Sequence, residues 1–279
     1  MISVVLSAVA GYALGFLVEH SFSLQHLLMS LFGVYLLSSG SLALNQAQEF
    51  ELDRKMRRTA KRPIAAGKIS PQQGLFIALI LLMAGLSILY SLSSLAGHIG
   101  LLTLLLYNGV YTYYWKPKWT FGAVPGAIPG ALPVSLGYAL VNQDIWNGEF
   151  VYQFLIMFLW QMPHFWCLAI RFKDDYAVGG VPTLPVSLGM EKALLHTGAW
   201  TFLYVGAALA SPWFLRASWF YVLLVVPFCL LLLREFYRFY SSKGEKAWFS
   251  FFMVTNISLL VFLFVPVIDK WNFLFIRHN

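Results

Sequence analysis

Charged residues are scarce in this chain and cysteine is almost absent. Asp, Glu, Lys and Arg together make up 11% of the 279 residues, against about 25% in a typical soluble domain. Hydrophobic residues reach 59% and aromatic residues 17%, which is more apolar surface than a soluble chain of this size buries. The composition therefore excludes an ordinary cytosolic enzyme, a disordered protein and a coiled coil. The two cysteines, Cys167 and Cys229, lie in apolar runs, so a disulfide scaffold and a cysteine-rich zinc site are excluded as well.

Long apolar runs take the place of the missing charge. A helix needs about 20 mostly apolar residues to cross the hydrocarbon core of a bilayer. The first run starts at Met1 with no basic segment before it, which favours a true span over a cleaved signal peptide. We expect an all-α membrane protein with nine transmembrane helices, near residues 2–18, 24–44, 75–94, 99–115, 121–141, 150–170, 193–210, 219–236 and 247–268. The lipid bilayer then surrounds most of the chain, and without a basic–aromatic ladder no nucleic acid is expected as a partner.

The basic residues alternate with the spans. All of the 19 Lys and Arg residues except Arg216, Lys270 and Arg277 fall in or beside the loops after the second, fourth, sixth and eighth spans. Cytoplasmic loops carry the excess of Lys and Arg in membrane proteins. We therefore expect these four loops and the N-terminus in the cytoplasm and the C-terminus outside. A missed or extra span would scramble this alternation, so the charges support the count of nine.

Asn45, Glu49 and Asp53 follow the second span, each four residues after the one before. On a helix this spacing places an amide and two carboxylates on one face. Like charges four residues apart repel, so a purely structural helix gains little from them. Such hard oxygen ligands suit Mg²⁺, which usually takes one or two carboxylates together with substrate phosphates. The basic residues from Arg54 to Arg62 suit phosphate oxygens; the alternative is a charged helix end with no ligand.

A second group of polar residues lies in and after the sixth span. Trp160, His164, Arg171 and Asp175 fall within a stripe about 60° wide at the helical 100° per residue. Ionisable residues inside a membrane are costly and point to a cavity or a site. We therefore predict a site at His164 and a kink at Pro163, with a satisfied core histidine as the alternative.

The fifth span carries Pro125, Pro129 and Pro133, the first two followed by glycine. Such a helix is tolerated in lipid where neighbouring helices or a cavity satisfy its backbone. Close helix packing and room for a bulky flat ligand are the two explanations. Because the charged clusters follow the second and sixth spans, we expect two four-helix halves plus a ninth helix, with both charged ends at a shared cytoplasmic mouth.

The motifs in these clusters resemble those of the UbiA superfamily of membrane prenyltransferases. The first is Asn45-xxx-Glu49-xxx-Asp53-Arg-Lys-Met-xx-Thr-xx-Arg62-Pro63, and the second is Trp160-Gln-Met-Pro-His164-Phe, followed by Arg171-Phe-Lys-Asp174-Asp175-Tyr176. The Trp-Gln-x-Pro-His signature, the segment Tyr111-Thr112 with Lys116, and the Pro-Gly-rich fifth span are similar to the branch that prenylates haem. The resemblance covers nearly the whole chain in order. Glu49 departs from the Asp more usual at its position, by one methylene.

The resemblance implies one UbiA-type prenyltransferase domain over residues 1–279. It implies transfer of the farnesyl group of farnesyl diphosphate to haem B at the cytoplasmic side of a bacterial inner membrane. Mg²⁺ is the implied cofactor, and a downstream haem A synthase is a candidate protein partner. The implied catalytic and metal-binding residues are Asn45, Glu49, Asp53, Asp174 and Asp175. The implied diphosphate-binding residues are Arg54, Arg62, Lys116, Arg171 and Lys173, and the implied haem-binding residues are His164 and Trp160.

Two alternatives remain open from the sequence. A UbiA-type enzyme that prenylates an aromatic or quinone precursor would keep the diphosphate motifs but has no need of the Trp-Gln-x-Pro-His signature. A membrane transporter would place its charges near the middle of the bilayer, whereas the two clusters here lie at the cytoplasmic ends of spans.

Overall fold

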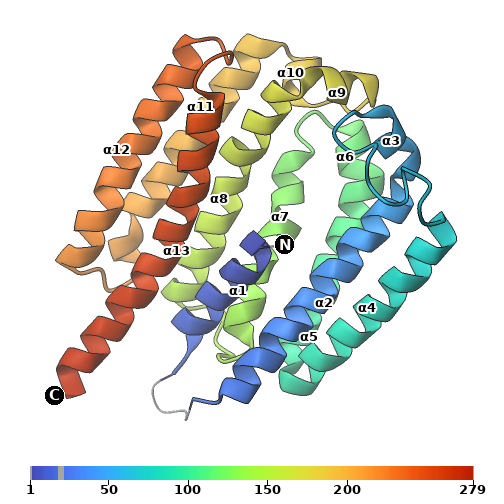
Figure 1. The fold of residues 1–279 in the computed structure, drawn as a ribbon. Helices are drawn as coiled ribbons and strands as arrows, with labels where there is room; N and C mark the ends of the chain where they lie inside the picture. The colour runs from blue at the N-terminus through green and yellow to red at the C-terminus, as the bar shows by residue number, and fades with distance from the viewer. Residues whose placement is uncertain (1, 18–21, 279) are drawn as a thin grey trace.

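The computed structural model describes residues 2–17 and 22–278, and the regular structure in this part of the chain is helical throughout (Figure 1). Its nine long α-helices match the nine expected spans: α1 (Ile2–Gly15), α2 (Leu24–Gln48), α4 (Pro71–Leu92), α5 (Ser94–Leu104), α7 (Ala123–Ala139), α8 (Gly148–Arg171), α11 (Met190–Leu209), α12 (Trp219–Ser241) and α13 (Trp248–His278). A π-helical segment, η1 (Leu105–Trp115), continues α5. Short helices lie in the connections: α3 (Phe50–Lys55), α6 (Lys116–Lys118), α9 (Lys173–Val178), α10 (Leu184–Ser187) and the 3-10 turn η2 (Ser211–Trp213).

Local sequence sets several helix starts. α4 begins behind Ser70, whose hydroxyl accepts from the Gln73 N–H while the Gln73 side chain accepts from the Ser70 N–H. α8 begins after Asn147, whose side chain accepts from the Phe150 N–H. These caps satisfy N–H groups that the first turn of a helix leaves without partners. The helices therefore begin at polar residues that flank the apolar runs.

Two large hydrophobic cores lie in the bundle, besides a small cluster around Tyr176 at its polar end. The first lies among α1, α2, α4, α5 and α7 and contains Leu37, Leu82 and Leu89. The second lies among α7, α8, α11, α12 and α13 and contains Ile156 and Phe262, both fully buried. α13 packs along α12 and α8 and also meets α1. The arrangement is two four-helix halves with α13 as the ninth helix, as the sequence predicts.

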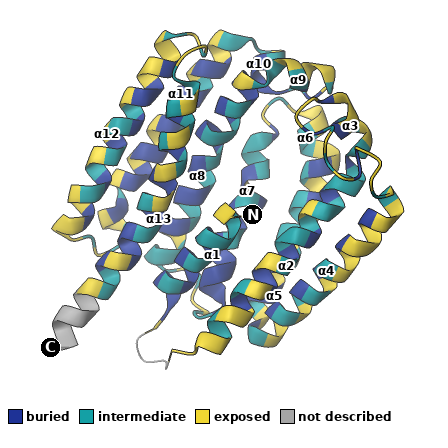
Figure 2. Cartoon of the chain, in the orientation of Figure 1, coloured by how far each residue is buried: buried dark blue, intermediate teal, exposed yellow. Residues whose placement is uncertain are grey.

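The outer faces of the bundle are apolar, whereas the connections at one end are polar. Among the described residues, α2, α4, α8, α12 and α13 as far as Asn272 are long and apolar enough to cross a membrane. Exposed residues follow the outer faces of α4 and α12 (Figure 2), and large apolar side chains such as Phe76 and Leu223 are among them. The short helices α3, α6, α9 and α10 gather at the opposite end from the C-terminus (Figure 1). The chain is a multi-pass integral membrane protein whose basic loops share one end.

Close helix packing, the first explanation offered for the fifth span, applies to α7. Gly137 lies so close to α1 that a Cβ atom there would stand 2.0 Å from the backbone oxygen of Ala8. Gly11 of α1 approaches the backbone oxygen of Val134 in the same way. Nearer the polar end, Gly130 packs against the Gln161 side chain, where a Cβ atom would stand 1.9 Å from the Oε1, and it also borders open space. Small residues thus allow close packing along α7, and room for a bulky flat ligand stays a prediction.

Candidate functional site

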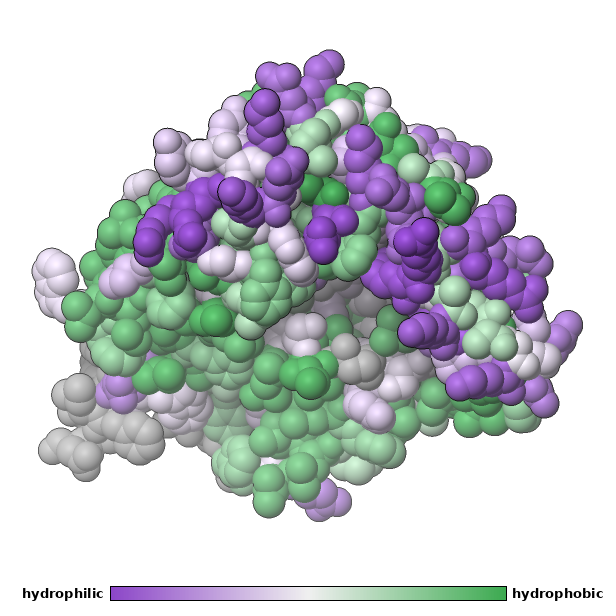
Figure 3. All heavy atoms as spheres, turned by 45° about the horizontal axis from the view of Figure 1, so that its top comes forward, coloured by the Kyte–Doolittle hydropathy of each residue, from purple (hydrophilic) through white to green (hydrophobic). Residues whose placement is uncertain are grey.

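A hollow opens at the polar end of the bundle, where hydrophilic side chains surround a recess (Figure 3). The space in this region, which we call the polar cavity, has a volume of about 290 Å³. Helices α2, α3, α6, α8 and α9, the segment η1 and the connection after α3 contribute its polar lining: Asn45, Asp53, Arg58, Thr59, Arg62, Tyr107, Tyr111, Lys116, Gln161 and Tyr176. The cavity thus joins residues of the first motif to side chains distant in the sequence.

The first motif bends at Glu49 and does not follow one continuous helix. α2 ends at Gln48, and Glu49 adopts φ −110° and ψ 13° before α3 begins. The expectation of a single helical face was therefore wrong in detail. The Glu49 backbone N–H still donates to the backbone oxygen of Asn45 at 2.9 Å, and the Asp53 backbone N–H donates to the backbone oxygen of Glu49 at 2.8 Å. These bonds keep Asn45, Glu49 and Asp53 in helical sequence around a corner, and all three are buried.

Each carboxylate at this corner is paired with a cation. The Lys116 Nζ donates to the two Glu49 oxygens at 2.7 and 2.6 Å. The Arg62 Nη1 donates to the two Asp53 oxygens at 3.0 and 2.8 Å. Asp53 is 1% exposed and Glu49 7%, and an ionised carboxylate so deeply buried requires such a partner. The corner therefore offers oxygen ligands for a metal ion and N–H donors for phosphate oxygens in one place.

The π-helical segment η1 is clamped to α2 beside this corner. The Asn108 amide donates to the Gln48 Oε1 at 3.2 Å, and the Asn45 amide donates to the Thr112 Oγ1 at 3.3 Å. The Thr112 hydroxyl itself donates to the backbone oxygen of Tyr107, five residues back, at 2.9 Å. π-Helical segments are rare and frequently accompany functional sites. Here the segment orients Asn45 so that its amide nitrogen is engaged and its oxygen remains for a ligand.

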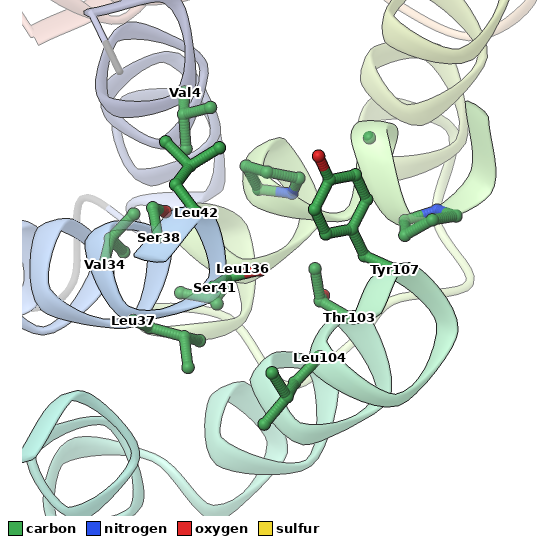
Figure 4. A pocket seen from close by; sticks show the side chains of 13 residues that line it. Val4, Val34, Leu37, Ser38, Ser41, Leu42, Thr103, Leu104, Tyr107 and Leu136 are labelled. Atoms are coloured by element: carbon green, nitrogen blue, oxygen red, sulfur yellow. The ribbon is translucent and has the colours of Figure 1, made fainter. Parts of the chain in front are cut away.

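A second, mostly apolar cavity adjoins the polar one. The apolar cavity has a volume of about 220 Å³ and lies among α1, α2, α5, η1 and α7. Figure 4 shows Val4 and Leu42 on one side of it and Tyr107 on another. Tyr107 and Gly130 line both cavities, so the two spaces meet at these residues. The Tyr107 ring stacks on Tyr111 with 5.6 Å between centroids. An amphipathic ligand fits this pair of spaces, with its polar head and apolar tail in different cavities.

The charged residues of the second motif lie beside the polar cavity and not in it, although Gln161 and Tyr176 of the same motif line it. Asp174, Asp175 and Arg171 line a separate pocket of about 560 Å³. The Asp175 carboxylate accepts from the backbone N–H of Arg58 at 3.1 Å, and Arg58 lines both this pocket and the polar cavity. Over the described ranges, no group of three or more His, Cys, Asp and Glu side chains is placed to hold a metal ion. The structure therefore does not bring the two sets of carboxylates into one cluster.

Three of the five basic residues expected near diphosphate lie outside the polar cavity, and Arg171 lines the separate pocket instead. The Arg54 Nε donates to the backbone oxygen of Ala65 at 3.1 Å, and its guanidinium lies 5.1 Å from the Phe50 ring centroid. Arg54 is exposed and Lys173 is half-buried, and neither side chain lines the polar cavity. Only Lys116 and Arg62 of the five expected diphosphate partners line that cavity.

The polar stripe of α8 faces α13. The Trp160 Nε1 donates to a backbone oxygen of α13 at 3.0 Å. The His164 ring lies 4.4 Å from the Trp160 ring and 5.0 Å from the Phe252 ring, centroid to centroid. The Arg171 guanidinium lies 5.1 Å from the Trp248 ring centroid. Trp160 and His164 line neither cavity, although the His164 Nδ1 is buried with no hydrogen-bond partner among the described residues.

Gln161 and Tyr107 were not expected in the site, and Arg58 was expected only as one of the basic residues from Arg54 to Arg62. Gln161 stands inside the Trp-Gln-x-Pro-His signature, and that neighbourhood was the available signal. Tyr107 and Tyr111 lie four residues apart, a spacing that ordinary apolar helices also show. Arg58 is one of several basic residues in a row, and the sequence offers no reason to separate it from its neighbours.

Comparison with known proteins gives consistent matches over nearly the whole chain. Residues 4–259 match the UbiA prenyltransferase family. A protein of Bdellovibrio bacteriovorus named protoheme IX farnesyltransferase is 58% identical over 275 residues, which cover 99% of this chain and 94% of that protein. The apo structure of a UbiA homolog from Aeropyrum pernix K1 has a TM-score of 0.73 at 20% identity and covers 95% of this chain and 98% of its own. A UbiA homolog from Archaeoglobus fulgidus bound to DMAPP and Mg²⁺ has a TM-score of 0.68 at 16% identity, covering 95% of this chain and 94% of its own. The two solved structures share the fold described here, and the chain belongs to the UbiA prenyltransferase family.

Proposed function

We propose that this protein transfers the farnesyl group of farnesyl diphosphate to the C2 vinyl group of haem B, giving haem O and diphosphate. One observation carries the reaction class: a polar cavity with paired charges meets an apolar cavity at Tyr107 and Gly130. This junction suits an isoprenoid diphosphate, whose head is anionic and whose tail is hydrocarbon. The choice of haem as acceptor rests on the likeness to the Bdellovibrio protein and its printed name.

The corner of the first motif suits Mg²⁺. Its oxygen ligands are two buried carboxylates and the side-chain oxygen of Asn45. The amide nitrogen of Asn45 already donates to Thr112. Asn45, Glu49 and Asp53 would hold the ion, a hard cation that prefers such oxygen ligands. When bound, Mg²⁺ supplies positive charge that stabilises the leaving diphosphate.

Lys116 and Arg62 are proposed to bind the diphosphate. Each now donates to a carboxylate of the corner, and each has further N–H donors that can turn to phosphate oxygens. Charge-assisted bonds of this kind strengthen as negative charge develops on the leaving group. Asp174, Asp175, Arg171 and Lys173 are proposed as a second, outer set of groups for Mg²⁺ and diphosphate, and Arg54 as a weaker electrostatic contributor.

The carbon chemistry needs an enclosure without water. Breaking the C1–O bond leaves its electron pair on diphosphate and an allylic cation at C1. The vinyl π pair then forms the new C–C bond, and a water oxygen adds to the remaining cationic carbon and loses a proton. The apolar cavity protects the first cation from water. Trp160 and His164 are proposed to act on haem from the α8–α13 interface.

We further propose residues 1–279 as a single domain in a bacterial inner membrane, with the basic loops and the polar cavity on the cytoplasmic side. Both substrates would then arrive from that side, and a downstream haem A synthase would receive the product.

The test is mass spectrometry of haems extracted from cells that express the chain and make no haem O of their own. Haem O should appear with the parent chain and be lost with Asp53→Asn. A prenylated aromatic or quinone in place of haem O would contradict the choice of acceptor. No prenylated product from any of these acceptors, with transport of a solute instead, would contradict the reaction class.

A further inference from the structure

Gln161 on α8 holds its side-chain amide in one orientation. The Nε2 donates to the backbone oxygen of Ala127 at 2.9 Å and to that of Met157 at 3.1 Å. Both partners are acceptors, so the amide nitrogen must face them and the carbonyl oxygen must face the other way. No donor among the described residues bonds that Oε1 atom. The side chain therefore presents a fixed carbonyl dipole with a free oxygen.

The free oxygen lies where the two cavities meet. A Cβ atom built on Gly130 would stand 1.9 Å from the Gln161 Oε1, so the oxygen packs directly against this glycine. Gly130 lines both cavities, and Gln161 itself lines the polar one. In an isoprenoid diphosphate, C1 is the atom that joins the anionic head to the hydrocarbon tail. A ligand spanning both cavities therefore places C1 at the junction, beside this oxygen.

We propose that Gln161 is a catalytic residue that stabilises the positive charge developing at C1 as diphosphate leaves. The inference rests on the proposed prenyl transfer. The negative end of a carbonyl dipole attracts an allylic cation, and the fixed amide pays no reorganisation at the moment of reaction. Glycine at position 130 is what lets the oxygen reach the junction, because any Cβ there would displace it. The dipole carries no formal charge, so it adds little repulsion toward the diphosphate in the ground state.

The experiment measures diphosphate release and haem O formation by purified protein carrying Gln161→Met, which keeps side-chain length and removes the dipole. Binding is measured separately with a farnesyl thiodiphosphate, whose C1–S bond resists ionisation. The matched control is Gln153→Met, since Gln153 is a buried glutamine of the same helix that donates to the backbone oxygen of Ala10. Gly130→Ala supplies a second variant, which keeps the Gln161 amide in the sequence but displaces its oxygen from the junction.

We expect Gln161→Met to lower kcat about 100-fold, the loss typical of one preorganised group, with analogue affinity unchanged within about twofold. The kcat of Gly130→Ala should fall as well, and Gln153→Met should retain the parental kcat. A kcat of Gln161→Met within about threefold of the parent would overturn the proposal. The proposal would also be overturned if Gln161→Met lost analogue affinity to the same extent as rate. Equal losses of kcat in the Gln161 and Gln153 variants would overturn it too. Diphosphate release reports C1–O cleavage for any acceptor, so a failure of haem as acceptor is distinguished from a failure of Gln161.

Discussion

Asp53→Asn tests the buried corner most directly, because it removes one charge and changes the side-chain shape little. Asp53 is 1% exposed, and Arg62 donates to both of its oxygens. Breaking a fully buried ion pair costs about 3–5 kcal/mol. The Arg62 side chain is 35% exposed, so water compensates part of the loss, and we expect about 1–3 kcal/mol of unfolding free energy to be lost. Activity should fall at least about 100-fold, as expected when a group that stabilises transition-state charge is removed.

Glu235→Gln is the matched control for this prediction. Glu235 is also a buried carboxylate held by an arginine, since Arg238 donates to both of its oxygens at 3.1 Å. It also accepts from the Ser250 hydroxyl, and it lines neither cavity. The control should lose comparable stability and keep its activity.

The assay is haem O formation by each purified variant, with thermal unfolding measured on the same preparation. Asp53→Asn should be inactive while still folded at the assay temperature. Haem O formation at the parental rate would refute the assignment of Asp53 to metal and diphosphate binding. Equal loss of activity in the Glu235 control would show that stability, and not the corner, limits the rate.

Three further predictions follow from other parts of the site. Glu49→Asp should keep activity within about tenfold. The flexible Lys116 side chain donates to both Glu49 oxygens and can still reach the carboxylate of the shorter Asp. Complete inactivity in the haem O assay would show that the longer side chain is required. His164→Ala should reduce haem O formation and haem retention while farnesyl diphosphate binding survives, because His164 lies outside the polar cavity. Equal loss of affinity for haem and for farnesyl diphosphate in a binding assay would assign His164 to packing between α8 and α13. Burial raises the pKa of Tyr176 above its ordinary value of 10.0, with the Arg58 guanidinium opposing the rise. The unfolded chain then loses that proton first, so stability should fall as pH rises above about 10, and less so in Tyr176→Phe; superimposable unfolding curves for the two proteins across that range would contradict the shift.

The sequence alone determined the nine helices, the shared end of the basic loops and the two motifs. The length of an apolar run is a local property, and lipid requires about 20 such residues to form one helix across it. The positions of Lys and Arg relative to those runs are local as well. Each expected span corresponds to one long helix of the structure, with η1 continuing α5 in the fourth. The carboxylates of Glu49 and Asp53 could likewise be selected from their spacing, because hard oxygen ligands in that order have few structural uses.

Tertiary structure decided which neighbour each helix face meets. Helical periodicity places Trp160 and His164 on one face, but it does not say whether a cavity or α13 covers that face; α13 does, through contacts with Phe252. Gln161, one residue and 100° away, faces the cavity instead. The pairing of Lys116 with Glu49 joins residues 67 positions apart, and no local pattern carries such information. Periodicity fixes which residues share a face, whereas the packing of whole helices, driven by contacts between distant segments, decides what that face touches.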